Sequence, residues 1–453
     1  MPHHSWQPLR CTLLTTLTLT LAACSTQTSA PAPQPDAAPY MRTVDITAAT
    51  TRQDLEAKYG QVLTYAPQAG FAVVSAPAPL SRQDLGTTDP NREPISEAVE
   101  PNTNAIRVSS GALWTDADVW HSGGALWTDG SGGFGWTNGN GGFGWTNGGA
   151  LWTDGKYIPL PQNSFAWVQV GLPQAHALAP KFGQNVKIAV IDTGIDLNHT
   201  AFADRLVAPS DMYDFVDNDH TPQEIGTPMV GSFGHGTGVA GIALQAAPNA
   251  KIMPLRVIEP DGLGDMDNVV NAVIFAVDHG AQIINLSLGS DQGSRSLQRA
   301  LEYAASRNVL VFEAAGNRNL EQLDRPAAFA AQQTYAGAAQ LSVGSVNSQD
   351  GKSWFSNYAT TLELSAPGEM IATLAPGERV AVWSGTSMST PLAAGIAALA
   401  LGEQGRLNAG SVASRLLSTA TNIDAVPANS AFIGKVGRRI NAANFVASYM
   451  PIP

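Results

Sequence analysis

The sequence predicts an α/β fold, in which a parallel β-sheet carries helices on both faces and follows a small α+β unit and a Gly/Trp-rich repeat. From about residue 156 to the C-terminus, apolar runs bounded by turn residues alternate with helical patterns. The runs are apolar without interruption, which is typical of parallel strands buried on both faces. Ahead of them lie a short strand–helix–strand–strand pattern and the repeat.

The composition is that of a globular protein, and the net charge bears on which classes of macromolecule the protein binds. The chain has 453 residues, of which 44% are hydrophobic and 14% charged. Its net charge of −12 argues against nucleic acid or anionic lipid as a partner. Cys11 and Cys24 are the two cysteines, and Cys11 lies in the expected signal peptide, so an intramolecular disulfide is excluded after processing.

The N-terminus, residues 1–24, is predicted to be an export signal. Arg10 precedes a short apolar, Thr-rich run that ends at Leu21-Ala22-Ala23-Cys24. This tetrapeptide resembles a bacterial lipobox, in which the cysteine is lipidated, whereas the alternative is an ordinary signal peptide cut nearby. We therefore expect export from a bacterial cell, with the protein either held at the membrane only through a lipid at Cys24 or secreted after processing.

Four segments are expected between the signal and the α/β region. In residues 41–80 the pattern is strand, helix, strand and strand, and a Thr51–Asp54 capping box begins the helix that Gly60 ends. The segments are a Ser/Pro/Ala-rich tether (25–40), the small α+β unit (41–80), a polar linker (81–109) and the repeat (110–155).

The repeat carries tryptophans nine residues apart, at Trp127, Trp136 and Trp145, with Asn-Gly or Asp-Gly turn signals between them. It lacks the aspartate and apolar positions of calcium-binding glycine-rich nonapeptides. We interpret it as an attachment without a catalytic group, either a Trp-bearing ribbon or a linker. A surface-binding protein that uses this repeat on an inactive scaffold is the alternative function.

The α/β region, residues 156–453, contains apolar strand candidates separated by helical patterns. The strand candidates are residues 186–192, 251–258, 281–289 and 308–316, and the helical patterns include 266–280, 296–308 and 392–401. The last helix consists mainly of Ala and Gly, which predicts tight burial.

Three motifs in this region together indicate nucleophilic catalysis. Asp192 ends an apolar strand, His235 lies between glycines at the start of a small-residue helix, and Ser387 lies at the N-terminus of another helix. A serine hydroxyl becomes a nucleophile when a histidine takes its proton, and the histidine needs a carboxylate to orient it.

The motifs "VIDTGID", "GHGTGVAGIA" and "SGTSMSTP", in this chain order, resemble the subtilase family of serine proteases over roughly residues 165–447. The resemblance implies a subtilisin-like fold, a serine endopeptidase acting on proteins or peptides, and no organic cofactor. It also implies a zymogen, whose prodomain would be residues 41–80. An esterase would show Gly-x-Ser-x-Gly and the order Ser, Asp, His, and neither occurs.

The resemblance extends to oxyanion and substrate positions. Asn317 falls where the family keeps the side-chain donor of the oxyanion hole. The walls of the substrate cleft would be Gly262, Leu263 and Gly264 on one side and Ser287, Leu288 and Gly289 on the other, and the side of the primary specificity pocket would be Ala314, Ala315 and Gly316. These small residues favour a large apolar substrate side chain, although the sequence does not identify the pocket floor. Arg318 is interpreted as a solvated surface charge, with an effect on the rim of this pocket as the alternative.

A loop before His235 is predicted to bind calcium. Its carboxylates repel one another unless water or a cation separates them, and calcium takes six to eight oxygen ligands. The stretch resembles a calcium loop of thermitase-like subtilases, which implies the ligands Asp214, Asp217, Asp219, Thr221 and Gln223. Ala201 replaces a ligand of another family site, which is therefore expected to be lost. Glu313 lies in an apolar strand, with Arg256 as one conceivable partner.

Overall fold

The computed structural model describes most of the chain from residue 40 onward. The described ranges are 40–76, 99–102, 106–107, 113–116, 119–122, 126–127, 152–153, 156–157, 163–228, 230–330 and 339–450. The predicted signal peptide, Cys24 and tether lie outside these residues, as does most of the repeat. Among the helices that the structure describes, none combines the length and apolar composition needed to cross a membrane.

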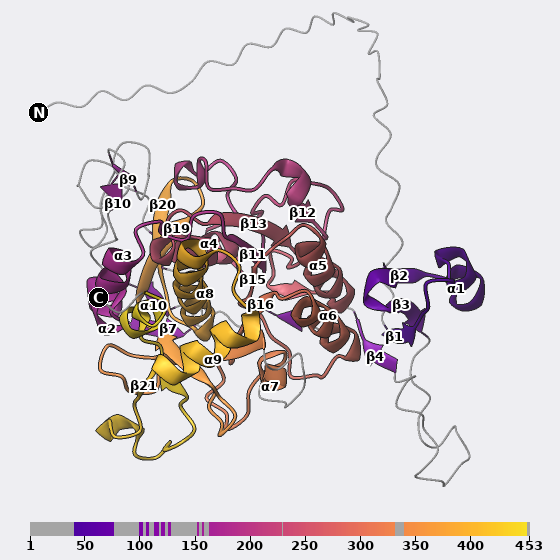
Figure 1. The fold of residues 1–453 in the computed structure, drawn as a ribbon. Coiled ribbons are helices and arrows are strands. Elements are labelled where there is room, and N and C mark those ends of the chain that lie inside the picture. Colours follow the sequence, from indigo (N-terminus) through magenta and orange to yellow (C-terminus); the bar gives the residue numbers. More distant parts are fainter. Residues whose placement is uncertain are drawn as a thin grey trace, which may run out of the picture. The chain divides into compact units, whose positions relative to one another are not determined.

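A nine-stranded sheet forms the centre of the α/β region (Figure 1). Its strands, in spatial order, are β12 (Tyr213–Asp214), β13 (Lys251–Arg256), β11 (Lys187–Asp192), β15 (Ile283–Leu286), β16 (Leu310–Ala314), β17 (Gln340–Val346), β18 (Leu364–Pro367), β22 (Arg438–Arg439) and β21 (Thr421–Asn422). All neighbouring pairs are parallel except β21–β22. The predicted parallel sheet is confirmed.

Helices cover both faces of this sheet, and side-chain alternation along each strand explains how. In β11, Ile188 and Val190 pack in the same core cluster as helices α4 and α8, whereas Ala189 and Ile191 pack with α5 and α6. The helices of the region are α2 (Ser164–Gln169), α3 (Leu172–Leu178), α4 (His235–Ala246), α5 (Met266–Asp278), α6 (Arg295–Ser306), α7 (Ala327–Ala330), α8 (Thr386–Gln404), α9 (Ala409–Thr419) and α10 (Ala442–Ala447). Both faces are thus apolar, as the uninterrupted strand sequences predict.

The small N-terminal unit has the predicted order of elements. It consists of β1 (Tyr40–Asp45), α1 (Arg52–Tyr59), β2 (Val62–Ala66) and β3 (Phe71–Ala76), and β4 (Val99–Pro101) joins its sheet. Thr51 and Asp54 form the expected capping box. Met41 and Phe71 belong to the same core cluster as α5 and α6, so one face of this small sheet packs on the α/β region.

Short strands are described in and beside the repeat. They are β5 (Ile106–Arg107), β6 (Leu113–Asp116), β7 (Val119–Ser122), β8 (Leu126–Trp127), β9 (Trp152–Thr153) and β10 (Lys156–Tyr157). β6 pairs with β7 and β9 with β10, each antiparallel. β8 adds to the hairpin of β19 (Ile371–Ala375) and β20 (Arg379–Trp383), and β5 pairs with β14 (Leu263–Gly264).

Candidate active site

The carboxyl end of β11 and the first residue of α4 bring Asp192 and His235 together. His235 Nδ1 lies 2.7 Å from Asp192 Oδ1, and both side chains are fully buried. The Thr193 backbone N–H also donates to Asp192 Oδ1, at 2.8 Å. Because Nδ1 faces the carboxylate, the imidazole is oriented with Nε2 away from it, and Nε2 has no hydrogen-bond partner among the described residues.

A second buried carboxyl group, that of Glu224, supports this pair and was not found from the sequence. Glu224 accepts hydrogen bonds from the hydroxyls of Thr193 at 2.7 Å and Thr237 at 2.9 Å. The Thr193 hydroxyl also accepts the Gly236 N–H at 2.9 Å. Glu224 therefore links the loop after Asp192 to the first turn of α4. Burial raises the pKa of Glu224 to about 8, with Asp192 contributing to the rise.

Ser387 is the second residue of α8, a helix that packs against α4. Its Oγ donates a hydrogen bond to the Ser287 carbonyl oxygen at 3.2 Å, and its side chain is buried. The structure therefore hydrogen-bonds the serine to Ser287, which belongs to one of the predicted cleft walls. Catalytic hydrogen bonds are often long or absent without substrate.

Asn317 follows β16 and is fixed by Thr386, the residue before Ser387. Asn317 Oδ1 accepts hydrogen bonds from the Thr386 N–H at 2.9 Å and the Thr386 hydroxyl at 3.0 Å. These two bonds set the orientation of the amide, because its oxygen is held and its Nδ2 donor must lie on the other side. The amide is thus held next to the N-terminus of α8.

The two predicted cleft walls hold the same stretch of extended backbone. On one side β5 pairs antiparallel with β14, with Arg107 opposite Leu263 and Ile106 opposite Gly264. On the other side the Arg107 N–H donates to Gly289 O at 3.0 Å, and the Gly289 N–H donates to Arg107 O at 2.9 Å. A segment of this chain thus lies between both walls as an added strand.

Comparison with known proteins places this site in a family. The sequence profile described as "Subtilase family" matches residues 183–436, more than half of the chain. The chain belongs to the subtilase family. Thermitase of Thermoactinomyces vulgaris is 37% identical over 265 residues, which cover 56% of this chain and 87% of thermitase. This subtilase is therefore a subtilisin-like serine protease that acts on proteins or peptides.

Other subtilases agree in sequence and fold. Subtilisin NAT of Bacillus subtilis subsp. natto is 32% identical over 284 residues, which cover 61% of this chain and 69% of that protein. The solved structure of proteases from Pseudoalteromonas arctica PAMC 21717 matches with a TM-score of 0.51 and 25% identity, covering 64% of this chain and 98% of that one. The predicted subtilisin-like α/β fold is confirmed.

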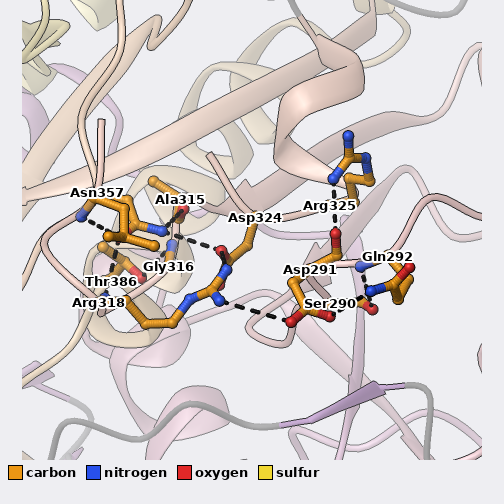
Figure 2. Close-up of polar contacts among 11 residues, drawn as sticks. Ser290, Asp291, Gln292, Ala315, Gly316, Arg318, Asp324, Arg325, Asn357 and Thr386 are labelled. Atoms are coloured by element: carbon orange, nitrogen blue, oxygen red, sulfur yellow. Dashed lines mark hydrogen bonds and ion pairs between the residues drawn. The ribbon is translucent and has the colours of Figure 1, made fainter. Parts of the chain in front are cut away.

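Beyond Asn317, the subtilase carries an ion-paired cluster that the sequence did not reveal (Figure 2). Arg318, interpreted as a solvated charge, instead donates from Nη2 to Asp324 Oδ1 at 2.5 Å, and its Nη1 lies 3.8 Å from Asp291. Asn357 Nδ2 donates to the same Asp324 oxygen at 3.1 Å. Arg318 is thus partly exposed, as a surface charge would be, and it is also ion-paired, because the chain brings Asp324 back beside it after a loop.

The predicted calcium loop contains an arginine among its carboxylates. Arg256 Nη1 lies 2.8 Å from Asp214 Oδ2 and 2.6 Å from Asp217 Oδ2. Asp219 Oδ1 accepts the Thr221 N–H at 2.6 Å, and the side-chain oxygen of Gln223 accepts the Leu197 N–H at 3.1 Å. Within the described part of the chain, no three His, Cys, Asp or Glu side chains are grouped as metal ligands. In the structure, Arg256 therefore balances the charge of two of the three predicted aspartate ligands.

The position of Arg256 also shows whether it is the ion-pair partner of the buried Glu313. Its guanidinium is engaged by the acidic loop, so it is not the partner of Glu313. Both carboxyl oxygens of Glu313 are buried without a hydrogen-bond partner among the described residues. Burial, and secondarily the charge of Glu363, raises its pKa well above the ordinary range.

Proposed function

We propose that Asp192, His235 and Ser387 form the catalytic triad of this protease. The hydrogen bond of 2.7 Å between His235 Nδ1 and Asp192 Oδ1 carries the proposal, since it leaves Nε2 available as the base. It favours an active enzyme over a scaffold that uses the Trp repeat for binding.

In the proposed reaction the chain's own groups move one proton. His235 Nε2 takes the proton of the Ser387 hydroxyl as Oγ attacks the peptide carbonyl, and then delivers it to the leaving amine. Asp192 stays ionised and stabilises the imidazolium. The Asn317 side chain and the Ser387 N–H at the start of α8 stabilise the oxyanion, and losing one such donor costs about 10²–10³-fold in rate, a magnitude known from subtilisin itself. Water then releases the acyl group.

The test is Ser387→Ala. The variant is expected to lose casein hydrolysis and labelling by a fluorophosphonate while melting at the wild-type temperature within a few degrees, because the change removes one hydroxyl. Casein hydrolysis at the wild-type rate would contradict the mechanism.

We infer that the protein is made as a zymogen whose prodomain is the unit at residues 41–80. Support comes from β5, which lies as an added strand between the walls assigned to substrate, Gly262–Gly264 and Ser287–Gly289. Extended peptides bind sheet edges in this way. The chain would therefore block its own cleft until the linker is cut.

Weakening this added strand should activate the uncut precursor. Ile106 is fully buried, so Ile106→Lys places a charge in an apolar site and is expected to loosen β5. We expect faster hydrolysis of a small peptide by precursor that a gel shows to be uncut. The matched control is Glu56→Lys on the exposed side of α1. Equal activity of the two variants would argue against self-inhibition.

We further propose a lipid at Cys24 and a calcium ion at the loop of residues 214–223. Two acyl chains would suffice for stable anchoring, and processing after the prodomain would still release the protease. Mass spectrometry of the exported precursor tests the lipid, because an unmodified N-terminus elsewhere than at residue 24 excludes it.

The calcium proposal rests on the family resemblance and the three clustered aspartates. The guanidinium of Arg256 is the competing account of how their charge is balanced.

A further inference from the structure

Residues 324 and 325 are hydrogen-bonded both to the segment assigned to the side of the primary specificity pocket and to the end of the cleft wall at Ser287–Gly289. The Asp324 N–H donates to Ala315 O at 3.0 Å, which ties this segment to the side of the pocket. Arg325 and Ser290 exchange two backbone hydrogen bonds of 2.8 Å, which tie it to the wall that ends at Gly289. Figure 2 shows Asp324 between these two groups of residues. The segment therefore links the two walls, as a pocket floor would.

The Asp324 carboxylate faces both walls. A Cβ atom placed on Gly316 would lie 2.4 Å from Asp324 Oδ2, and one placed on Gly289 would lie 3.6 Å from the same oxygen. The hydrogen bonds from Arg318 and Asn357 go to the other oxygen, Oδ1. Asp324 is only 5% exposed, so Oδ2 is held in place beside the two glycines.

We propose that Asp324 determines specificity, and that this protease prefers lysine or arginine as the residue whose carbonyl is attacked. The inference rests on the proposed protease site and names the substrate class of that site. This specificity differs from the large apolar substrate residue that the small side walls led us to expect. The walls leave room for a long side chain, and the carboxylate of Asp324 supplies the charge that selects a basic one.

The neighbouring charges leave Asp324 able to accept a second cation. An ionised carboxylate has two acceptor oxygens, and Arg318 uses one of them. The Arg318 side chain is 38% exposed and also faces Asp291, so it has a second carboxylate to share. The Arg325 guanidinium donates to the Asp291 backbone oxygen at 2.9 Å instead. The carboxylates of Asp324 and Asp291 share one cation, Arg318. A substrate ammonium or guanidinium at Asp324 Oδ2 would therefore supply the second positive charge.

The experiment compares two substrates on the full chain after its own maturation. Succinyl-Ala-Ala-Pro-Lys and succinyl-Ala-Ala-Pro-Phe p-nitroanilides are hydrolysed by wild type, Asp324→Asn and the control Asp204→Asn, a carboxylate on the exposed surface. We expect wild type to favour lysine by at least tenfold in kcat/KM. Asp324→Asn should lose at least tenfold in this ratio, while Asp204→Asn keeps it. The wild-type ratio should also fall with added salt, since salt screens charge attraction.

The ratio separates this inference from the function it rests on. If neither substrate is cleaved and Ser387 is not labelled by a fluorophosphonate, the proposed protease site itself is wrong. If the protein is labelled and active but prefers phenylalanine, or if Asp324→Asn leaves the ratio unchanged, the specificity inference alone is overturned. Because the ratio is taken on the same active fraction, partial misfolding of a variant does not affect it.

Discussion

Glu224 lies buried beside the Asp192–His235 pair, and its pKa of about 8 makes the fold sensitive to pH. Its ordinary pKa is 4.5, so the folded state binds the proton more tightly than the unfolded chain does. The free energy of unfolding therefore decreases as the pH rises from about 4.5 to about 8.

The prediction is that Glu224→Gln removes this part of the pH dependence. An amide cannot ionise, so the unfolding free energy of the variant should fall less steeply between about pH 5 and 8. Urea unfolding at several pH values measures this free energy for Ser387→Ala proteins with and without Glu224→Gln, which are not expected to digest themselves. Parallel curves for the two proteins would show that Glu224 is ionised in the folded state throughout. Other raised carboxyl groups, such as Glu363, contribute equally to both proteins.

Residues in short motifs could be predicted from the sequence, and residues that act through distant contacts could not. Asp192, His235, Asn317 and Ser387 each lie in a motif that indicates its chemistry. Glu224 and Asp324 lie in loops of ordinary composition, and their roles depend on partners up to 33 residues away. The pocket-floor role proposed for Asp324 depends on two distant backbone contacts: its own N–H donates to Ala315 O, and its neighbour Arg325 pairs with Ser290.

At the scale of elements, α4 and α8 pack against each other, and each carries one residue of the proposed triad, His235 and Ser387. Gly395 allows the close approach, since a Cβ there would lie 2.5 Å from the Cβ of Ala246 and 2.7 Å from the carbonyl oxygen of Ala243. The predicted tight burial of the Ala/Gly helix is confirmed, because α8 is buried from Thr386 to Leu401.

Gly395→Ala tests this contact. Overpacking costs about 1–3 kcal/mol, and the better helix propensity of alanine returns up to about 1 kcal/mol. We therefore expect a lower unfolding free energy and a reduced kcat, because the added methyl would push apart the helices that carry His235 and Ser387 of the proposed triad. Ser411→Ala on the exposed side of α9 is the control and should stay within about 0.5 kcal/mol of wild type. A variant as stable and active as the control would contradict the role given to this glycine.

Long elements could be predicted because their signal is local. The uninterrupted apolar runs and the 3.6-residue periodicity are visible in any short window, so β11, β13, β15, β16, α5 and α6 lie where the sequence places them. The two-residue strands β5 and β8 could not be predicted. Each is a strand only through pairing with β14 or β20, which lie more than 150 residues away.

For the whole molecule, the calcium proposal predicts a shift in thermal stability. Binding to the native state alone adds about 3 kcal/mol at a hundredfold excess over Kd. Ser387→Ala protein is expected to melt at a higher temperature with calcium than with chelator, and Asp219→Asn should abolish the difference. Coinciding melting temperatures would mean that Arg256 alone balances the charge of the loop.

The strand at Ile106–Arg107 has a consequence for how such a protease is switched on. In the proposed zymogen this strand would belong to the chain that it blocks, so its effective concentration at the cleft would be set by the linker, on the order of millimolar, and dilution would not lower it. A single cut converts it into a separate molecule, whose occupancy then falls with dilution. After such a cut, dilution into a large volume would remove the strand from the cleft, so that the proposed export would complete the activation that the cut begins.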